Sequence, residues 1–218
     1  MFRVMLFSQW KWSRLIIALG SIAGFALPIL SVQGATRPDR GALSAPDLLQ
    51  ALQSWGTLYP VLAAALGLLV AVAAWAPDHR GRHVHALSLP LPRWRYALLR
   101  FGAGLVLLTA PVGAVLVGAI LATASATVPP GLQTYPIALA ARFALAVLVA
   151  YAVFFSVSSG TSRTAAFILA GLGSVIVVQV IAGAANVDLD LPGRLLPIVL
   201  NWPGPFAIFT GRWMLIDV

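Results

Sequence analysis

Cysteine and glutamate are both absent from this chain of 218 residues, and lysine occurs once. Without cysteine the protein cannot form disulfides, thiolate metal sites or a cysteine nucleophile. Charge is also scarce, at 9% of residues, whereas soluble domains usually carry about 25%. Apolar residues are abundant instead, at 60% of the chain. This composition indicates a membrane protein.

Missing motifs exclude the common catalytic sites. A phosphate loop of the form G-x-x-x-x-G-K-[ST] is absent, because Lys11 is the one lysine and does not stand in such a motif. The nearest approach to a G-x-S-x-G elbow, around Ser162, lacks the second glycine. No two carboxylates share an apolar stretch, which excludes a proton relay or a glycosidase pair. We therefore expect no catalytic site, and any ATP hydrolysis is expected in a partner.

Five apolar stretches are long enough to cross a bilayer, which takes about 20 residues. They are expected to be helices, because lipid cannot satisfy exposed backbone polar groups. The expected spans are 15–32, 55–76, 101–128, 136–157 and 165–185. We therefore predict an all-α, polytopic integral membrane protein in which residues 1–218 form a single transmembrane domain.

The two ends of the chain differ from these spans. Residues 1–14, MFRVMLFSQWKWSR, combine basic residues with aromatic and apolar bulk, which is typical of an interfacial helix. The alternative is a cleaved signal peptide that ends near Gly34. Towards the other end, three prolines interrupt the apolar stretch 195–209. We expect 186–218 to form a short, partly buried segment outside the membrane and not a sixth span.

The distribution of basic residues predicts the orientation. With the N-terminus in the cytoplasm, nine lysines and arginines fall inside and four fall outside. Those inside are Arg3, Lys11, Arg14, Arg80, Arg82, Arg93, Arg95, Arg100 and Arg163, and those outside are Arg37, Arg40, Arg194 and Arg212. The +8 formal charge does not indicate nucleic acid, because these residues are scattered between apolar stretches.

The loop 78–95 concentrates the polar residues of the chain, including all three histidines. Pro90 and Pro92 favour extended backbone before them, so we expect a short helix, a turn and a new helix near Arg93. The loop has an apolar centre, which a solvated loop does not need but a docking loop does. A zinc site at His79 and His83 is the alternative use of the histidines. Because Asp78 is the only further ligand close in sequence, we prefer docking contacts and expect no metal.

These residues carry a family resemblance. An acidic residue ends the second span. It is followed by a glycine, by the motif Leu-x-x-Pro-x-x-Arg and by a basic residue at the start of the third span. The matching positions are Asp78, Gly81, Leu87, Pro90, Arg93, Tyr96 and Arg100. The pattern resembles the permease subunit of ATP-binding-cassette (ABC) exporters of the type-2 class, which have an interfacial helix and six spans. Two features depart from it: the family commonly has glutamate at position 78, and a sixth span would be expected beyond Val218.

The resemblance implies a permease subunit in a bacterial plasma (inner) membrane, in contact with lipid, a second permease subunit and an ATPase subunit that binds the ATP. The loop would be the coupling helix that docks on the ATPase. The residues assigned to docking are Asp78, Arg80, Arg82, His83, Val84, Leu87, Leu89 and Arg93. Arg142, within the fourth span, is the candidate for the substrate path; the alternative is an arginine that reaches to the interface. The alternative functions are a non-transporting membrane anchor or scaffold, and a membrane enzyme.

Overall fold

The computed structural model describes residues 2–35, 45–80, 92–126, 131–160, 174, 177–178, 198, 200–201, 204 and 206–217. The chain divides into two compact units, Met1–Phe155 with Arg212–Val218, and Ser156–Gly211. Both candidate sites described below belong to the first unit. The predicted fifth span, 165–185, lies almost wholly outside the described residues.

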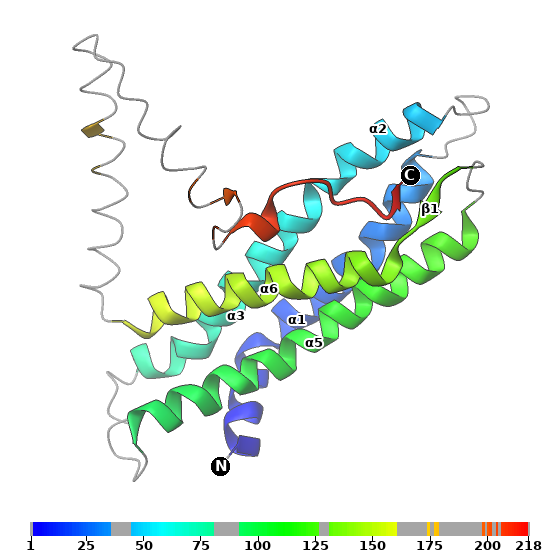
Figure 1. Ribbon diagram of the computed structural model, residues 1–218. Helices are drawn as coiled ribbons and strands as arrows, with labels where there is room; N and C mark the ends of the chain where they lie inside the picture. The colour runs from blue at the N-terminus through cyan, green and yellow to red at the C-terminus, as the bar shows by residue number, and fades with distance from the viewer. Residues whose placement is uncertain are drawn as a thin grey trace. The chain divides into compact units, whose positions relative to one another are not determined.

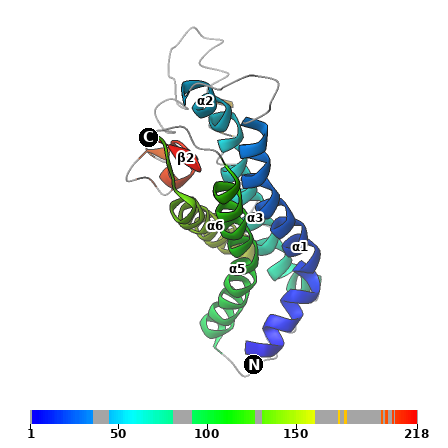
Figure 2. The same cartoon turned by 90° about the vertical axis from the view of Figure 1, so that its right-hand side faces the viewer.

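The described part of the chain is mostly helical, as expected. Its helices are α1 (Phe2–Ala35), α2 (Ala45–Gly56), α3 (Leu58–Arg80), α5 (Arg93–Ser125), α6 (Pro136–Ser159) and the 3₁₀ helix η2 (Ala207–Phe209). Its strands are β1 (Gln133–Thr134) and β2 (Ile216–Asp217). Helices α1, α3, α5 and α6 lie side by side, with the N-terminus of α1 at the end opposite β1 (Figures 1 and 2).

Four helical stretches are long and apolar enough to cross a membrane. They are Phe2–Gly34, Leu48–Asp78, Trp94–Ser125 and Pro136–Ser159, and each overlaps one of the first four predicted spans. The structure differs from the prediction at the first of them, because residues 1–14 and 15–32 do not form separate elements. One helix of 34 residues runs from Phe2 to Ala35. No proline or glycine lies between Phe2 and Leu19 to end the helix there.

The lengths of α1 and α5 exceed what a bilayer requires. Helices of 34 and 33 residues extend for about 50 Å, whereas the hydrocarbon core is about 30 Å thick. The excess places several turns of each helix at or beyond the interface, or requires a tilt. The N-terminal turns of α1, which the sequence indicated as interfacial, are part of this excess.

Glycines allow the helices to approach closely, as is usual between membrane helices. A Cβ added at Gly24 of α1 would lie 3.2 Å from the carbonyl oxygen of Pro111 in α5. Gly118 of α5 lies directly against the backbone of Phe25 in α1. Gly20 instead packs against Leu66 of α3. Gly20 and Gly24 of α1 therefore pack against two different helices of the same chain.

The core and the periphery of the first unit have the pattern expected of a bundle in lipid. Many of its buried positions are alanines, whereas large apolar side chains are exposed along every long helix. Examples are Val4, Leu19, Val61 and Ile137, which are between 64% and 73% exposed. Because lipid tails are as apolar as leucine, such exposure carries no penalty in a membrane.

The C-terminal residues complete the first unit at the end where β1 lies. β1 and β2 pair in antiparallel register, Gln133 opposite Asp217 and Thr134 opposite Ile216. The amide of Tyr135 donates a hydrogen bond to the carbonyl of Leu215 (2.8 Å). Within the predicted outer segment 186–218, residues 206–217 contain only the short η2 helix and β2, and several of their side chains are buried. The buried side chains are those of Trp213, Leu215 and Ile216, and the position of the segment 186–218 outside the membrane stays a prediction.

Candidate functional site

A buried group of polar side chains joins α3 to α5 near the N-terminal end of α1. The guanidinium of Arg100 donates a hydrogen bond to the carboxylate of Asp78 and contacts the hydroxyl of Tyr96. The Tyr96 hydroxyl in turn donates to the Asp78 carboxylate, at 3.0 and 3.1 Å from its two oxygens. The side chains of Arg100 and Asp78 are only 6% and 3% exposed. Asp78, Tyr96 and Arg100 are called the ion-pair cluster below.

The local sequence explains why these three side chains come together. Asp78 lies near the C-terminal end of α3, and Tyr96 and Arg100 lie in the first turns of α5. Positions four apart share one face of a helix, so Tyr96 and Arg100 both face α3. Because α3 and α5 are antiparallel and joined through residues 81–92, their ends are held close together.

Aromatic rings surround the charged groups. The guanidinium carbon of Arg100 lies 5.1 Å from the centroid of the Trp75 ring and 5.2 Å from that of Tyr96. Trp75 packs against Phe155 with centroids 5.1 Å apart, and its indole N–H donates to the Phe155 carbonyl (3.2 Å). Cation–π contacts stabilise an arginine over such rings, and exclusion of water strengthens the ion pair.

Helices α1 and α6 are attached to the same region. The side-chain amide of Gln9 in α1 donates to the carbonyl of Arg100 (3.1 Å). The hydroxyl of Tyr151 in α6 donates to the carbonyl of Phe101 (3.3 Å), and the two rings stack with centroids 5.0 Å apart. Helices α1, α3 and α6 therefore all contact the start of α5 beside the ion-pair cluster.

The contacts of this group are an ion pair and hydrogen bonds that join two helix ends. The group holds one carboxylate, one guanidinium and one phenol, and no group of three metal-ligating side chains occurs among the described residues. Loss of one partner from a buried ion pair costs about 3–5 kcal/mol, because the other charge is left uncompensated. The cluster therefore keeps the ends of α3 and α5 together on either side of the loop.

The predicted docking residues are placed only in part. Asp78 is buried in the ion-pair cluster. Its side chain is therefore not at the surface, where a docking partner would contact it. Arg80 ends α3 and Arg93 begins α5, and their side chains are not described. The other predicted docking residues, Arg82, His83, Val84, Leu87 and Leu89, lie outside the described residues. The predicted helix start at Arg93 is confirmed, and Pro92 before it is extended (φ −62°, ψ 138°).

Arg142 lies at the other end of the bundle, in the second turn of α6. Its guanidinium donates to the carbonyl of Arg212 and lies over the ring of Trp213, with the guanidinium carbon 4.7 Å from the centroid. The Trp213 ring stacks on Tyr59 of α3, with centroids 6.2 Å apart. Sequence reasoning singled out Arg142 as a charge within a span but gave no indication of these partners.

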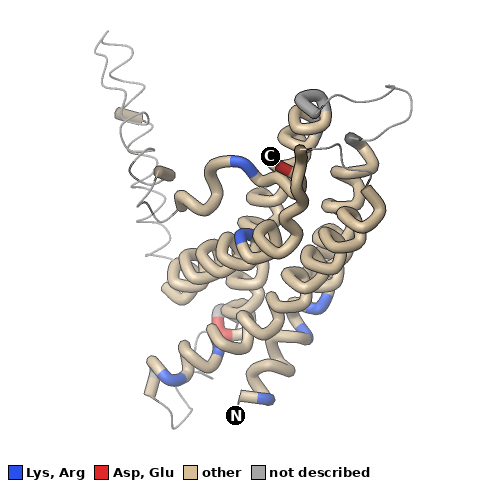
Figure 3. Tube along the Cα trace, turned by 45° about the vertical axis from the view of Figure 1, so that its right-hand side comes forward, with Lys and Arg blue, Asp and Glu red and all other residues tan. Residues whose placement is uncertain are grey.

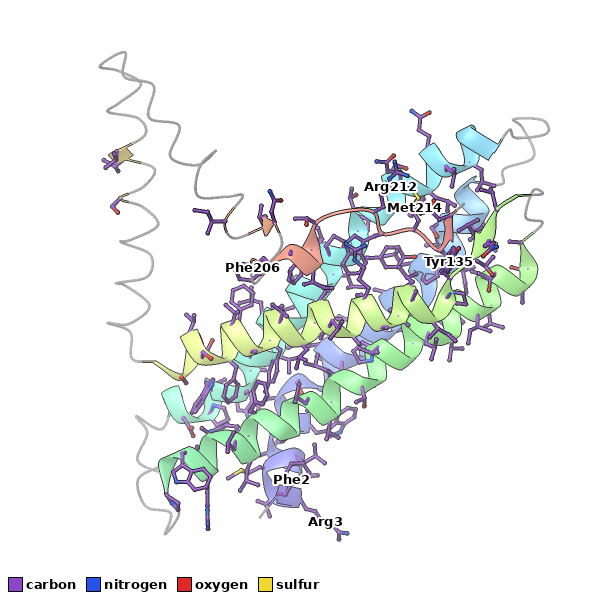
Figure 4. All side chains as sticks on the ribbon, viewed as in Figure 1. Phe2, Arg3, Tyr135, Phe206, Arg212 and Met214 are labelled. Carbon is purple, nitrogen blue, oxygen red and sulfur yellow. The ribbon has the colours of Figure 1, made fainter. Side chains whose placement is uncertain are left out.

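A pocket of about 310 Å³ opens beside Arg142. Its lining comes from the start of α6 and from the C-terminal stretch: Tyr135, Ala138, Leu139, Arg142, Arg212, Met214 and Asp217. Figure 4 labels Tyr135, Arg212 and Met214, which lie beside the N-terminal end of α6.

Charge is distributed unevenly between the two ends of the first unit (Figure 3). The described basic residues at the end that holds the ion-pair cluster are Arg3, Lys11, Arg14, Arg80, Arg93, Arg95 and Arg100. Those described at the opposite end are Arg142 and Arg212. This asymmetry has the same sense as the one counted from the sequence.

Comparison of the chain with protein-family models, with curated proteins and with solved structures gives no match.

Proposed function

We propose that this protein is the permease subunit of an ATP-driven ABC exporter, coupled through the loop 78–95 to a separate ATPase subunit. The observation that carries this proposal is the ion-pair cluster. Asp78, Tyr96 and Arg100 are three of the positions on which the family resemblance depends, and they come from opposite sides of the loop. In the structure they form one buried group.

The cluster gives the loop a mechanical role. If the ends of α3 and α5 were free to separate, a force on the loop would only bend the chain where the loop joins each helix. It would not move the helices themselves. Because a buried ion pair joins them, the two helix ends would move together. Gln9 would pass the movement to α1, and Tyr151 would pass it to α6. A displacement of the loop would therefore reach all four long helices.

In the proposed cycle the partner performs the chemistry. ATP binding closes the ATPase dimer, and this closure displaces the loop of each permease subunit. The joined helices then shift, and substrate passes between this chain and a second permease subunit. This chain needs neither a phosphate loop nor a cofactor for that role, since the ATP is bound by the partner.

The proposed location is a bacterial inner membrane with the N-terminus in the cytoplasm. The excess of basic residues at the end with the ion-pair cluster supports this orientation, because cytoplasmic loops are enriched in lysine and arginine. The same orientation places the loop where an ATPase could reach it.

The test is co-purification of the chain with the ATPase subunit proposed to bind it. In a docking interface a few central apolar anchors carry most of the binding energy, whereas charges at the rim chiefly tune register and association rate. Leu87→Asp should therefore abolish the complex, and Arg80→Ala should weaken it modestly. The matched control is Leu132→Asp, which makes the same change in the connection at the opposite end of the bundle.

All three variants should still insert into the membrane, because none of these changes lies inside a predicted span. The proposal fails if Leu87→Asp still co-purifies with the ATPase and still transports. A stable complex with a partner that does not hydrolyse ATP would instead favour the anchor or scaffold function.

A further inference from the structure

The pocket beside Arg142 has an excess of positive charge. Two arginines, Arg142 and Arg212, line it together with one carboxylate, that of Asp217. Its lining therefore carries one net positive charge. The pocket also lies at the N-terminal end of the 24-residue helix α6, where the helix macrodipole is positive.

Arg142 is held in a fixed orientation at this pocket. Its guanidinium donates a hydrogen bond to the carbonyl of Arg212 and lies over the ring of Trp213, which is itself buried and stacked on Tyr59. A guanidinium carries five N–H donors in one plane, so contacts that fix the plane also fix the directions in which it can donate. A group held in this way loses little entropy when it binds a ligand.

The surroundings of the pocket are compatible with the level of lipid headgroups. Arg142 is six residues from Pro136, the first residue of α6, which is about 9 Å along the helix. Ile137 beside the pocket is apolar and 73% exposed, as expected of a side chain in lipid. Tyr135, which lines the pocket, is 38% exposed, and exposed aromatic residues of this kind are typical of membrane–water interfaces.

We infer that this pocket binds a phosphodiester monoanion at the membrane surface. Arg142 would supply the pre-oriented guanidinium, Arg212 the second cation, and Asp217 would limit the charge that the pocket accepts. One net positive charge suits a phosphodiester better than a doubly charged phosphate. The group could be carried by an anionic lipid headgroup or by a soluble molecule. The inference does not depend on the permease function, because it needs only the pocket and a membrane location.

The experiment measures thermal unfolding of the full chain in a neutral maltoside detergent. A ligand that binds only the folded state stabilises it by RT ln(1 + c/Kd), where c is the free ligand concentration, so Tm rises as c exceeds Kd. The three probes are phosphatidylglycerol, dimethyl phosphate, and diacylglycerol as a lipid without phosphate. We expect phosphatidylglycerol to raise Tm progressively with its concentration and diacylglycerol to have no effect. A response to dimethyl phosphate as well would show that the soluble phosphodiester is sufficient, and its absence would identify the lipid as the ligand.

Variants identify the site. Arg142→Gln should weaken the apparent affinity for phosphatidylglycerol about tenfold or more, since it removes a charge-assisted hydrogen bond. Arg212→Gln should weaken it too, and this change keeps the backbone carbonyl that Arg142 uses. Asp217→Asn should strengthen binding, and the control Arg14→Gln, at the opposite end of the bundle, should leave it unchanged. The inference is overturned if Arg142→Gln and Arg212→Gln both respond like the unmodified chain, or if diacylglycerol gives the same rise.

Discussion

The carboxylate of Asp78 and the guanidinium of Arg100 form an ion pair that joins the last turn of α3 to the second turn of α5. Both side chains are almost fully buried. They are two of the few charged residues in this chain. A buried pair of this kind is costly to assemble, because both ions lose their hydration, but it is more costly to break. The pair thus favours one arrangement of the two helix ends over others.

The first prediction concerns the energy of this pair. Asp78→Asn should lower the free energy of unfolding by about 3–5 kcal/mol, because Arg100 would remain charged and buried. The double variant Asp78→Asn with Arg100→Met should be clearly more stable than the sum of the two single changes predicts. The measurement is reversible unfolding in mixed micelles of neutral detergent and dodecyl sulfate. Strict additivity of the two changes would show that the residues do not interact.

The second prediction concerns the contact between α1 and α5. A Cβ added at Gly118 would lie 3.1 Å from the Cα of Phe25 and closer to its carbonyl oxygen, so the two helices would have to separate. Gly118→Ala should therefore cost about 1–3 kcal/mol, the usual range for overpacking.

Gly113, in the same helix, provides the matched control for this change. A Cβ there would meet nothing within 4 Å. Gly113→Ala should leave stability unchanged or raise it by up to about 1 kcal/mol, from helix propensity alone. Equal losses for the two variants, measured by the same unfolding assay, would contradict the close approach of α1 and α5.

The sequence predicted the helices well because their signal is local. Length and apolarity alone located the four helices that are long and apolar enough to cross a membrane, and Pro92 located the start of α5. The expected interfacial segment 1–14 and the first span belong to one continuous helix, since a change from amphipathic to apolar character does not by itself end a helix. The tertiary partners were harder to predict, because they depend on which helix faces touch.

Arg100 illustrates this difficulty at the ion-pair cluster. Sequence reasoning noted it only as the basic residue that opens the third span, although an aspartate and an arginine at the facing ends of two antiparallel helices are a usable signal. No comparable signal existed for the contact of Arg142 with Trp213. These residues are 71 positions apart by their numbers, and the short β1–β2 ladder that brings the C-terminal stretch to α6 has no periodicity to detect.

The third prediction is the orientation of the chain in the membrane. With the N-terminus inside, a cysteine at position 44 or 133 should react with a membrane-impermeant maleimide in intact spheroplasts. A cysteine at position 85 should react only after permeabilisation. The natural absence of cysteine means that each introduced thiol is the only one to label. Reaction at position 85 in intact spheroplasts, with none at position 44, would reverse the orientation.

The fourth prediction concerns the register of β1 and β2, which positions Arg212 and Asp217 at the pocket. Gln133 lies directly opposite Asp217 in this ladder. Directly opposed residues have Cβ atoms about 4.5–5.5 Å apart, close to the separation that a disulfide requires. Gln133→Cys with Asp217→Cys should therefore form a disulfide under mild oxidation, and mass spectrometry of the linked peptides would detect it.

The control for this cross-link moves one of the two cysteines by one residue along its strand. Successive side chains of a strand point to opposite faces, so Thr134→Cys with Asp217→Cys places the two thiols on different faces of the ladder. This pair should oxidise much more slowly, although its positions are equally close in sequence. Efficient cross-linking of both pairs would mean that residues 212–217 move freely past β1. Arg142 is oriented by Arg212 and Trp213 from this same stretch. Such movement would therefore also remove the fixed orientation of its guanidinium, on which the proposed anion site depends.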